Sequence, residues 1–190
     1  MEKCKKQIEK FQHQARSTKR QYVSGETLFI WGKQYYLSFQ PNSQKNGFEI
    51  KGDKVILSMR EESTVKQREN YVREQYRILL KAEIERLLPK WERLTELYCD
   101  SWQTKYMLTR WGTCNTEKKK LWFNLQLAQK PIECLEYVIL HELLHLKERT
   151  HNSVFISYMD LYMKDWRAVR KELNDLRLDY YNLSLIHISE

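Results

Sequence analysis

The chain has 190 residues, of which 42% are hydrophobic and 31% charged, and its 33 basic and 25 acidic side chains give a net charge of +8. This length suits one domain with a sizeable core, and no apolar run approaches the ~20 residues that a membrane-spanning helix needs. The first residues are charged, with no apolar stretch behind them, which excludes a secretory signal peptide. We therefore expect a soluble, cytoplasmic protein.

The basic excess is spread along the chain. The longest basic run is Lys118 to Lys120, and acidic residues are interleaved nearly everywhere else. We interpret these charges as a solvated surface, with a weak association with nucleic acid or another polyanion as the alternative. The four cysteines form no Cys-x-x-Cys pair, which argues against a zinc ribbon or a thioredoxin-type motif.

The two ends of the chain differ from its middle. Residues 1–21 are basic and weakly patterned, and we predict a partly flexible segment there. The tail, residues 182–190, is predicted to be disordered or an artefact of the sequence, which leaves residues 22–181 as a single domain. Within it, aromatic and β-branched runs at 28–39 and 48–59 each surround a glycine turn. Each run is typical of a β-hairpin, and together they predict a small antiparallel sheet.

A long helix is predicted next, with Ser63 as its N-cap and apolar residues recurring in three- and four-residue steps. Pro89 should stop or kink this helix, so that a second, short one follows. The alternating residues 102–110 and the apolar run 121–127 are typical of strands. The polar turn between them predicts that these two strands pair as a hairpin.

The remaining elements are predicted to be helical. Pro131 suits a first helical turn, where its missing N–H would have no partner in any case. An apolar stripe then leads into the motif HELLH at residues 141–145. Asn152 or Ser153 can cap another helix, and a last helical stretch should run from Val169 to about Tyr181.

The stretch that specifies chemistry is His141-Glu142-Leu143-Leu144-His145, followed by His151. Residues four apart lie on one face of a helix, so His141 and His145 can share one metal ion. His151 follows the predicted helix end, where a bend can return it as the third ligand. Three protein ligands and a water are the pattern of a catalytic zinc site. Glu142 lies beside them and suits a general base that takes the proton of that water.

Three observations favour a metal site over ordinary helical histidines. The helix is otherwise apolar, three of the five histidines fall within eleven residues, and the third comes where the chain can bend back. A carboxylate is the competing third ligand, and Asp160 or Glu172 would return to the site more easily than Glu148. The spacing from His141 to His151 matches the metzincin signature, but Glu148 replaces its glycine and no Met-turn is evident.

Several segments together match one known family. They are Tyr22–Glu26, Leu28–Leu37, Arg110–Cys114, Phe123–Leu125, Tyr137–Leu146, His151–Ser153 with Phe155, and Asp165–Arg167. With these motifs the chain resembles the YgjP-like family of zinc metallopeptidases, which is related to the SprT-like and WLM metalloproteases. The resemblance covers about Tyr22 to Leu176.

This resemblance implies an α+β fold, a compact zincin-like minimal metallopeptidase domain. Its elements would be N-terminal antiparallel strands, a long helix, a β-hairpin, the active-site helix with the HExxH motif, and C-terminal helices. It also implies Zn²⁺ on His141, His145 and His151, with Glu142 as the general base and a peptide or protein as the substrate.

In this family the Arg-Trp-Gly segment and the strand after it lie beside the active-site helix. The resemblance therefore suggests that the substrate adds as an extended strand along that edge, with Trp111, Gly112 and Asn124 lining the site. The alternative roles are core packing for Trp111 and a turn-stabilising amide for Asn124.

Taken together, these features predict a zinc-dependent metallopeptidase that hydrolyses peptide bonds through a zinc-activated water. One alternative is a nucleic-acid-associated protein whose zinc site is vestigial or regulatory, which the net charge of +8 would support. The other is a zinc hydrolase of non-peptide bonds, which the same ligands could serve. The chain lacks the cysteine-rich zinc ribbon that some SprT-like proteins carry.

Overall fold

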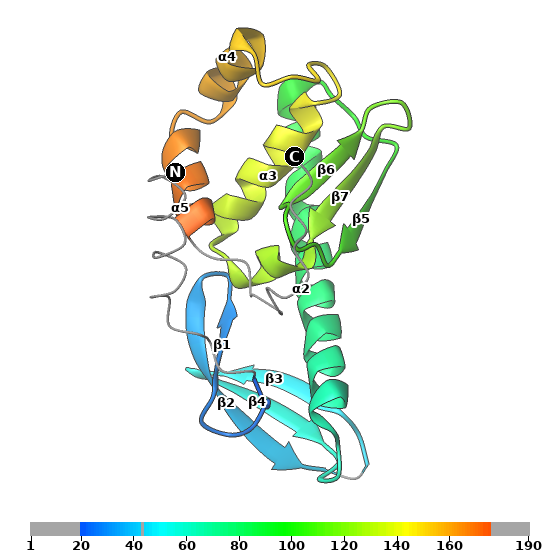
Figure 1. The fold of residues 1–190 in the computed structure, drawn as a ribbon, viewed down its shortest axis with the longest axis vertical. Coiled ribbons are helices and arrows are strands. Elements are labelled where there is room, and N and C mark those ends of the chain that lie inside the picture. Colours follow the sequence, from blue (N-terminus) through cyan, green and yellow to red (C-terminus); the bar gives the residue numbers. More distant parts are fainter. Residues whose placement is uncertain (1–19, 43, 176–190) are drawn as a thin grey trace, which may run out of the picture.

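The computed structural model describes residues 20–42 and 44–175. Figure 1 shows a sheet at the bottom, one long helix rising from it, and a second group of strands and helices above. The predicted α+β fold is confirmed. The segment 1–21 and the tail 182–190 lie almost wholly outside the described residues, so the domain boundaries at 22 and 181 stay predictions. In the described part of the chain, no helix combines the length and the apolar character needed to cross a membrane.

The first sheet contains both predicted hairpins. Its strands are β1 (Thr27–Ile30), β2 (Lys33–Pro41), β3 (Gly47–Lys51) and β4 (Lys54–Met59), in the order β1-β2-β4-β3. The hairpins join through β2 and β4, which pair in parallel, so the prediction of a wholly antiparallel sheet is wrong. The chain leaves β2 for the outer edge, forms β3 there, and returns as β4 beside β2. Residue alternation identifies strands but does not specify which strands become neighbours.

The long helix α2 (Val65–Thr95) contains 31 residues, which makes it about 46 Å long. Its N-cap is Thr64 rather than the predicted Ser63. The Thr64 hydroxyl accepts a hydrogen bond from the Gln67 backbone N–H at 3.2 Å, and the Gln67 side chain accepts one from the Thr64 N–H at 2.8 Å. This reciprocal pair of bonds satisfies two N–H groups that a helix start leaves open.

The helix α2 also passes through Pro89, so the prediction that it stops there is wrong. Proline removes one backbone hydrogen bond from a helix. Around it, Leu87, Leu88 and Trp91 are all buried in the core, and this packing outweighs the loss. The helix ends at Glu96, whose left-handed backbone (φ 57°) terminates it.

The second sheet consists of β5 (Ser101–Lys105), β6 (Gly112–Asn115) and β7 (Lys120–Asn124), in the order β5-β7-β6. The hairpin is formed by β6 and β7, whereas β5 pairs with β7 in parallel. The predicted hairpin between 102–110 and 121–127 is therefore wrong. Residues 106–111 leave the sheet, and the later run turns at Leu125 into a 3-10 helix, η1 (Leu125–Gln129).

Three helices complete the described chain: α3 (Ile132–Leu144), α4 (Ser153–Tyr162) and α5 (Trp166–Asp175). As predicted, Pro131 precedes α3 and Asn152 caps α4, its side chain accepting from the Phe155 N–H at 3.0 Å. The helix α5 begins at Trp166, ahead of the predicted Val169, and its predicted end lies outside the described residues. The apolar helix α3 packs on α2 and lies between α5 and β6 (Figure 1). The last turn of α3 therefore lines a cavity together with residues of α5 and β6.

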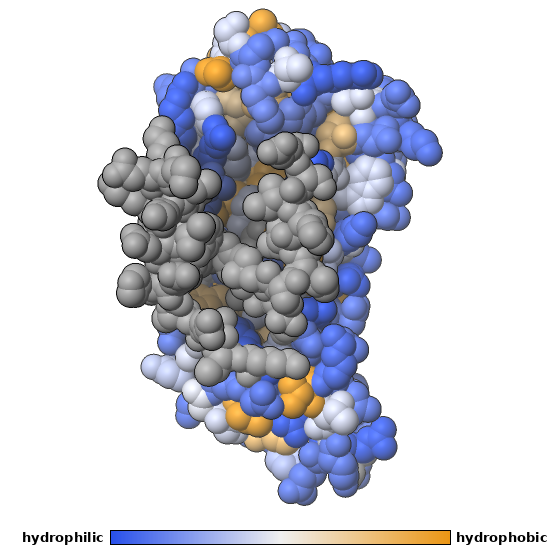
Figure 2. Space-filling model, in the orientation of Figure 1, coloured by the Kyte–Doolittle hydropathy of each residue, from blue (hydrophilic) through white to orange (hydrophobic). Residues whose placement is uncertain are grey.

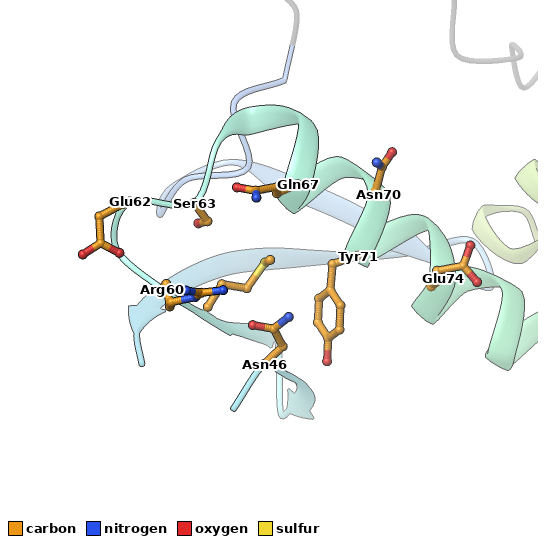
Figure 3. Close-up of a pocket in the computed structure, with 9 residues that line it drawn as sticks. Asn46, Arg60, Glu62, Ser63, Gln67, Asn70, Tyr71 and Glu74 are labelled. Atoms are coloured by element: carbon orange, nitrogen blue, oxygen red, sulfur yellow. The ribbon is translucent and has the colours of Figure 1, made fainter. Parts of the chain in front are cut away.

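A polar cavity of about 460 Å³ lies where β4 leads into α2. Figure 3 shows Asn46, Arg60 and Tyr71 directed into it. In Figure 1 this connection is at the bottom, whereas the chain after the HELLH motif is at the top, so this cavity is remote from the predicted chemistry. The face shown in Figure 2 is mostly hydrophilic, with some hydrophobic residues over the first sheet.

Candidate metal centre

Three histidines converge at the end of α3. His141 lies in its last turn, His145 is its C-cap, and His151 lies just before α4. The Nε2 atom of His141 is 3.2 Å from that of His145 and 2.9 Å from that of His151, and the latter two are 3.2 Å apart. Among the described residues, these three histidines are the side chains grouped so that they could hold a metal ion.

The loop from His145 to His151 owes its shape to Glu148. Its backbone N–H donates to the Leu144 carbonyl at 2.9 Å, and its carboxylate accepts from the Thr150 N–H at 3.2 Å and from the Thr150 hydroxyl at 3.0 Å. These bonds close the turn that brings His151 back over α3. Glu148, which replaces the glycine of the metzincin signature, therefore shapes the loop and is not a ligand.

The other carboxylates considered as third ligands lie elsewhere. Asp160 accepts a hydrogen bond from the Trp166 indole N–H at 2.8 Å and forms an ion pair with Arg167. Glu172 lies on α5 and is exposed, and it does not belong to the histidine cluster. The geometry therefore favours His151 as the third ligand.

The orientations of the His145 and His141 rings follow from the partners of their Nδ1 atoms, since Nε2 is the atom that faces the cluster. His145 Nδ1 is 3.1 Å from the Glu148 carbonyl oxygen. A carbonyl can only accept, so Nδ1 carries the proton and Nε2 turns its lone pair to the cluster. His141 Nδ1 lies 3.5 Å from the Tyr137 hydroxyl. The Phe155 ring packs against all three imidazoles, with centroid distances of 4.8–5.0 Å.

The role of these residues in orienting the imidazoles was not predicted from the sequence. Tyr137 stands four residues before His141, so helical spacing could have identified it. Phe155 is one of the residues that carry the family resemblance, and its buried ring packs against the imidazoles. A backbone carbonyl such as that of Glu148 leaves no signal in a sequence.

The cluster has the dimensions of a zinc site. Zinc–nitrogen bonds of about 2.0–2.1 Å in a tetrahedral arrangement separate the ligand atoms by about 3.3 Å, close to the observed 2.9–3.2 Å. Burial, together with the neighbouring His145 and His151, lowers the pKa of His141 to about 3, and burial likewise lowers the pKa of His151. Both shifts favour the neutral form of His141 and His151, which is the form that binds metals. Nitrogen lone pairs this close repel one another unless a cation lies between them.

Glu142 lies on the face of α3 that meets β6. Its side chain is buried, with 6% of its surface exposed, and it lines a cavity of about 250 Å³ together with His141, Trp111 and Gly112. Burial raises its pKa to about 8, while the charge of Arg110 acts in the opposite direction. A cation bound by the histidines would also stabilise the carboxylate form.

The three predicted substrate-lining residues occupy different environments. Trp111 and Gly112 line the cavity beside Glu142. Asn124 is completely buried behind them, where its Nδ2 donates to the carbonyls of Met107 at 2.8 Å and Arg110 at 2.7 Å. Asn124 therefore holds the segment before β6 in place, which is the turn-stabilising role considered as the alternative. Trp111 lines the cavity and also packs against the core.

Gly112 is needed because Glu142 lies directly against it. A Cβ atom at Gly112 would lie 2.6 Å from Glu142 Oε1 and 2.7 Å from its Cγ. We expect Gly112→Ala to displace the carboxylate and to lower kcat by on the order of 10²-fold, because small misplacements of reacting groups are that costly. The control is Gly47→Ala, whose Cβ would meet Ser58 at an ordinary 3.4 Å. Full turnover by Gly112→Ala with a native thermal transition would contradict this account of Glu142.

Comparisons with known proteins identify a family for this chain. No curated protein matches the chain. Among solved structures, the metallopeptidase zymogen abylysin of Pyrococcus abyssi is 15% identical with a TM-score of 0.45, over 52% of this chain and 99% of its own. For the metallopeptidase zymogen jannalysin of Methanocaldococcus jannaschii the values are 19%, 0.40, 50% and 94%. The family model of the YgjP-like metallopeptidase domain matches residues 1–176. The chain therefore belongs to the YgjP-like family and is a metallopeptidase.

Proposed function

We propose that this metallopeptidase binds zinc through His141, His145 and His151 and hydrolyses peptide bonds with Glu142 as its general base. The observation that carries the proposal is the convergence of three imidazole Nε2 atoms, 2.9–3.2 Å apart, at the edge of the cavity that Glu142 lines. Zinc prefers imidazole nitrogen, and a site with three protein ligands keeps a position open for a water or a substrate.

Bound zinc supplies a Lewis acid that acidifies water and polarises a peptide carbonyl. The remaining work falls to side chains of this chain. Glu142 accepts a proton from the attacking water and delivers it to the leaving amine. Gly112 leaves the space that the carboxylate occupies, and burial excludes bulk water from it. Tyr137 and Phe155 hold the imidazole rings in their orientations.

The substrate is a peptide or protein, and we propose that it binds as an extended strand along β6. This strand lies at the edge of its sheet, so one side of its backbone has no partner among the described strands. Such an edge can accept the backbone hydrogen bonds of an added strand. The position of β6 beside α3 would bring the scissile bond close to Glu142, with Trp111 and Gly112 along its path.

The other predictions from composition have less support than the peptidase site. Nucleic-acid association, for example, rests on the net charge of +8 alone. The family assignment favours peptide bonds over non-peptide substrates. Salt-sensitive binding to nucleic acid by a protein that cleaves no peptide would favour the alternative of a binding protein.

Zinc removal and re-addition test the proposal. Zinc-loaded protein is incubated with an unfolded protein substrate, and the new termini are identified by mass spectrometry. We expect hydrolysis to disappear after dialysis against a chelator and to return with one equivalent of zinc, because the open coordination position is the source of the reactive water. Turnover that persists in the metal-free protein would contradict the proposal. So would a fully zinc-loaded protein that cleaves no peptide bond.

A further inference from the structure

Two arginines line the cavity beside Glu142. Arg110 belongs to the segment before β6, and Arg170 belongs to α5. Figure 1 shows α5 and β6 on opposite sides of α3, the helix that contributes His141 and Glu142 to the same cavity. The two arginines thus belong to elements on opposite sides of the helix that contributes the reacting residues.

Both arginines project from backbone that is firmly held. The Arg110 carbonyl accepts a hydrogen bond at 2.7 Å from the buried Asn124 amide. On α5, the neighbours Val169 and Leu173 are buried, and the Trp166 ring stacks on Tyr137 of α3. The placement of the two charges is therefore a property of the fold.

The charge of these arginines is not neutralised within the described residues. Several other arginines pair with a carboxylate, namely Arg73 with Glu69, Arg77 with Glu74, Arg86 with Glu83 and Arg167 with Asp160. No such pair forms at Arg110 or Arg170 in the part of the chain that the structure describes.

Among the residues that the structure describes, Glu142 is the one acidic side chain that lines the cavity, and the proposed reaction uses it. A metal ion on the histidines would add further positive charge. The cavity therefore has a surplus of positive charge that an anionic group of the substrate would offset.

We propose that Arg110 and Arg170 make the site select peptides that carry a carboxylate next to the scissile bond. Guanidinium groups match carboxylates in charge and in the geometry of their N–H donors. The carboxylate comes either from an Asp or Glu side chain or from the free C-terminus of a peptide. This inference rests on the proposed function, because it concerns the substrate of that same site.

A different role for Arg170 would be to stabilise the charge that develops in the transition state of every substrate. The two roles differ in one measurable respect. A selecting arginine affects acidic peptides and leaves neutral ones unchanged, whereas a transition-state role lowers kcat for all peptides equally.

The test compares three fluorescent peptides that share one neutral sequence. The first has blocked termini and a central Glu, the second is identical but has Gln in that place, and the third is the Gln peptide with a free C-terminal carboxylate. Binding is measured by anisotropy to zinc-loaded Glu142→Gln protein, which does not cleave the peptides. Hydrolysis is measured with zinc-loaded protein that retains Glu142.

Each measurement is repeated with Arg110→Gln, Arg170→Gln and Arg170→Lys. The control is Arg167→Gln, since Arg167 is an exposed arginine of α5 that pairs with Asp160.

We expect the Glu peptide or the free-acid peptide to bind about 10–100-fold more tightly than the neutral one, since charge-assisted hydrogen bonds have this strength. Which of the two is preferred identifies the source of the carboxylate. Arg170→Gln and Arg110→Gln should reduce the preference, Arg170→Lys should retain part of it, and Arg167→Gln should leave it unchanged. Added salt should weaken it, because both arginines are exposed.

Equal binding of all three peptides would overturn the inference. A preference that remains in both Arg110→Gln and Arg170→Gln would also overturn it, because the metal alone would then attract the carboxylate. An equal loss of turnover for all peptides in Arg170→Gln would overturn it as well. Selective binding without hydrolysis of any peptide would uphold the arginine role and contradict the proposed function. Hydrolysis without selectivity would uphold the proposed function and contradict the arginine role.

Discussion

Glu142→Gln is expected to lower kcat by on the order of 10²–10⁴-fold, the usual contribution of a general base, while zinc stays bound. Glutamine has the same shape as glutamate and fits the space beside Gly112, but its amide cannot accept the proton of the attacking water. The three imidazoles that hold the metal are unchanged. The measurement is peptide turnover by protein whose zinc content has been determined on the same sample.

Glu133→Gln is the matched control, because Glu133 is an exposed carboxylate in the first turn of the same helix. It should retain full turnover. Rapid hydrolysis by zinc-loaded Glu142→Gln would show that another group moves the proton.

The same substitution has a consequence for stability in the metal-free protein. Burial raises the pKa of Glu142 from 4.5 to about 8 in the folded state. Between these two values the unfolded chain releases this proton while the folded chain retains it, so the free energy of unfolding falls as the pH rises. Glu142→Gln should lack this decrease, which denaturant titrations at several pH values between 5 and 8 would detect.

His151→Ala is expected to lower zinc affinity by more than about 100-fold, beyond the loss typical of a residue that only supports a ligand, and to remove turnover with it. His151 is exposed and lies in a loop, so its removal should leave the fold intact, whereas His141 is much more deeply placed. Zinc titration against a competing chelator measures the effect, and circular dichroism checks the fold.

Arg149→Ala serves as its control, since Arg149 is an exposed residue of the same loop. It should bind zinc like the unsubstituted chain. Unchanged zinc affinity in His151→Ala would contradict the assignment of His151. It would favour the competing assignment of a carboxylate, Asp160 or Glu172, as the third ligand.

The grouping of the three histidines could be predicted from sequence because the elements that produce it are local. His141 and His145 share a helix face by spacing alone, and Asn152 marks the next helix start through a bond to the nearby Phe155 backbone. The return of His151 needs only the turn that Glu148 closes. Each of these features spans about one or two turns of chain, where local preferences decide the structure.

The strand pairings could not be predicted in the same way, because they are non-local. Both sheets contain a parallel pair, β2 with β4 and β5 with β7, and alternation of residues is the same for parallel and antiparallel neighbours. Continuation of α2 through Pro89 also depends on tertiary packing that overrides local preference. Asn124 was predicted to line the site. Its side-chain amide instead donates hydrogen bonds to the backbone carbonyls of Met107 and Arg110, which only the fold brings near.

The arginines of the cavity illustrate the same limit. Arg110 and Arg170 are distant in sequence, and each stands in a stretch that contains other charged residues. They become one feature only when α5 packs on α3 and the segment before β6 is held by Asn124. A net charge of +8 gives no indication that two of these charges line the same cavity as Glu142.

Anomalous X-ray diffraction at the zinc edge, from crystals of the zinc-loaded protein, tests the central claim most directly. We expect one strong peak between the Nε2 atoms of His141, His145 and His151, with a position open toward Glu142 that a water occupies. A peak at cysteines or carboxylates elsewhere, or a fourth protein ligand that closes the site, would contradict it.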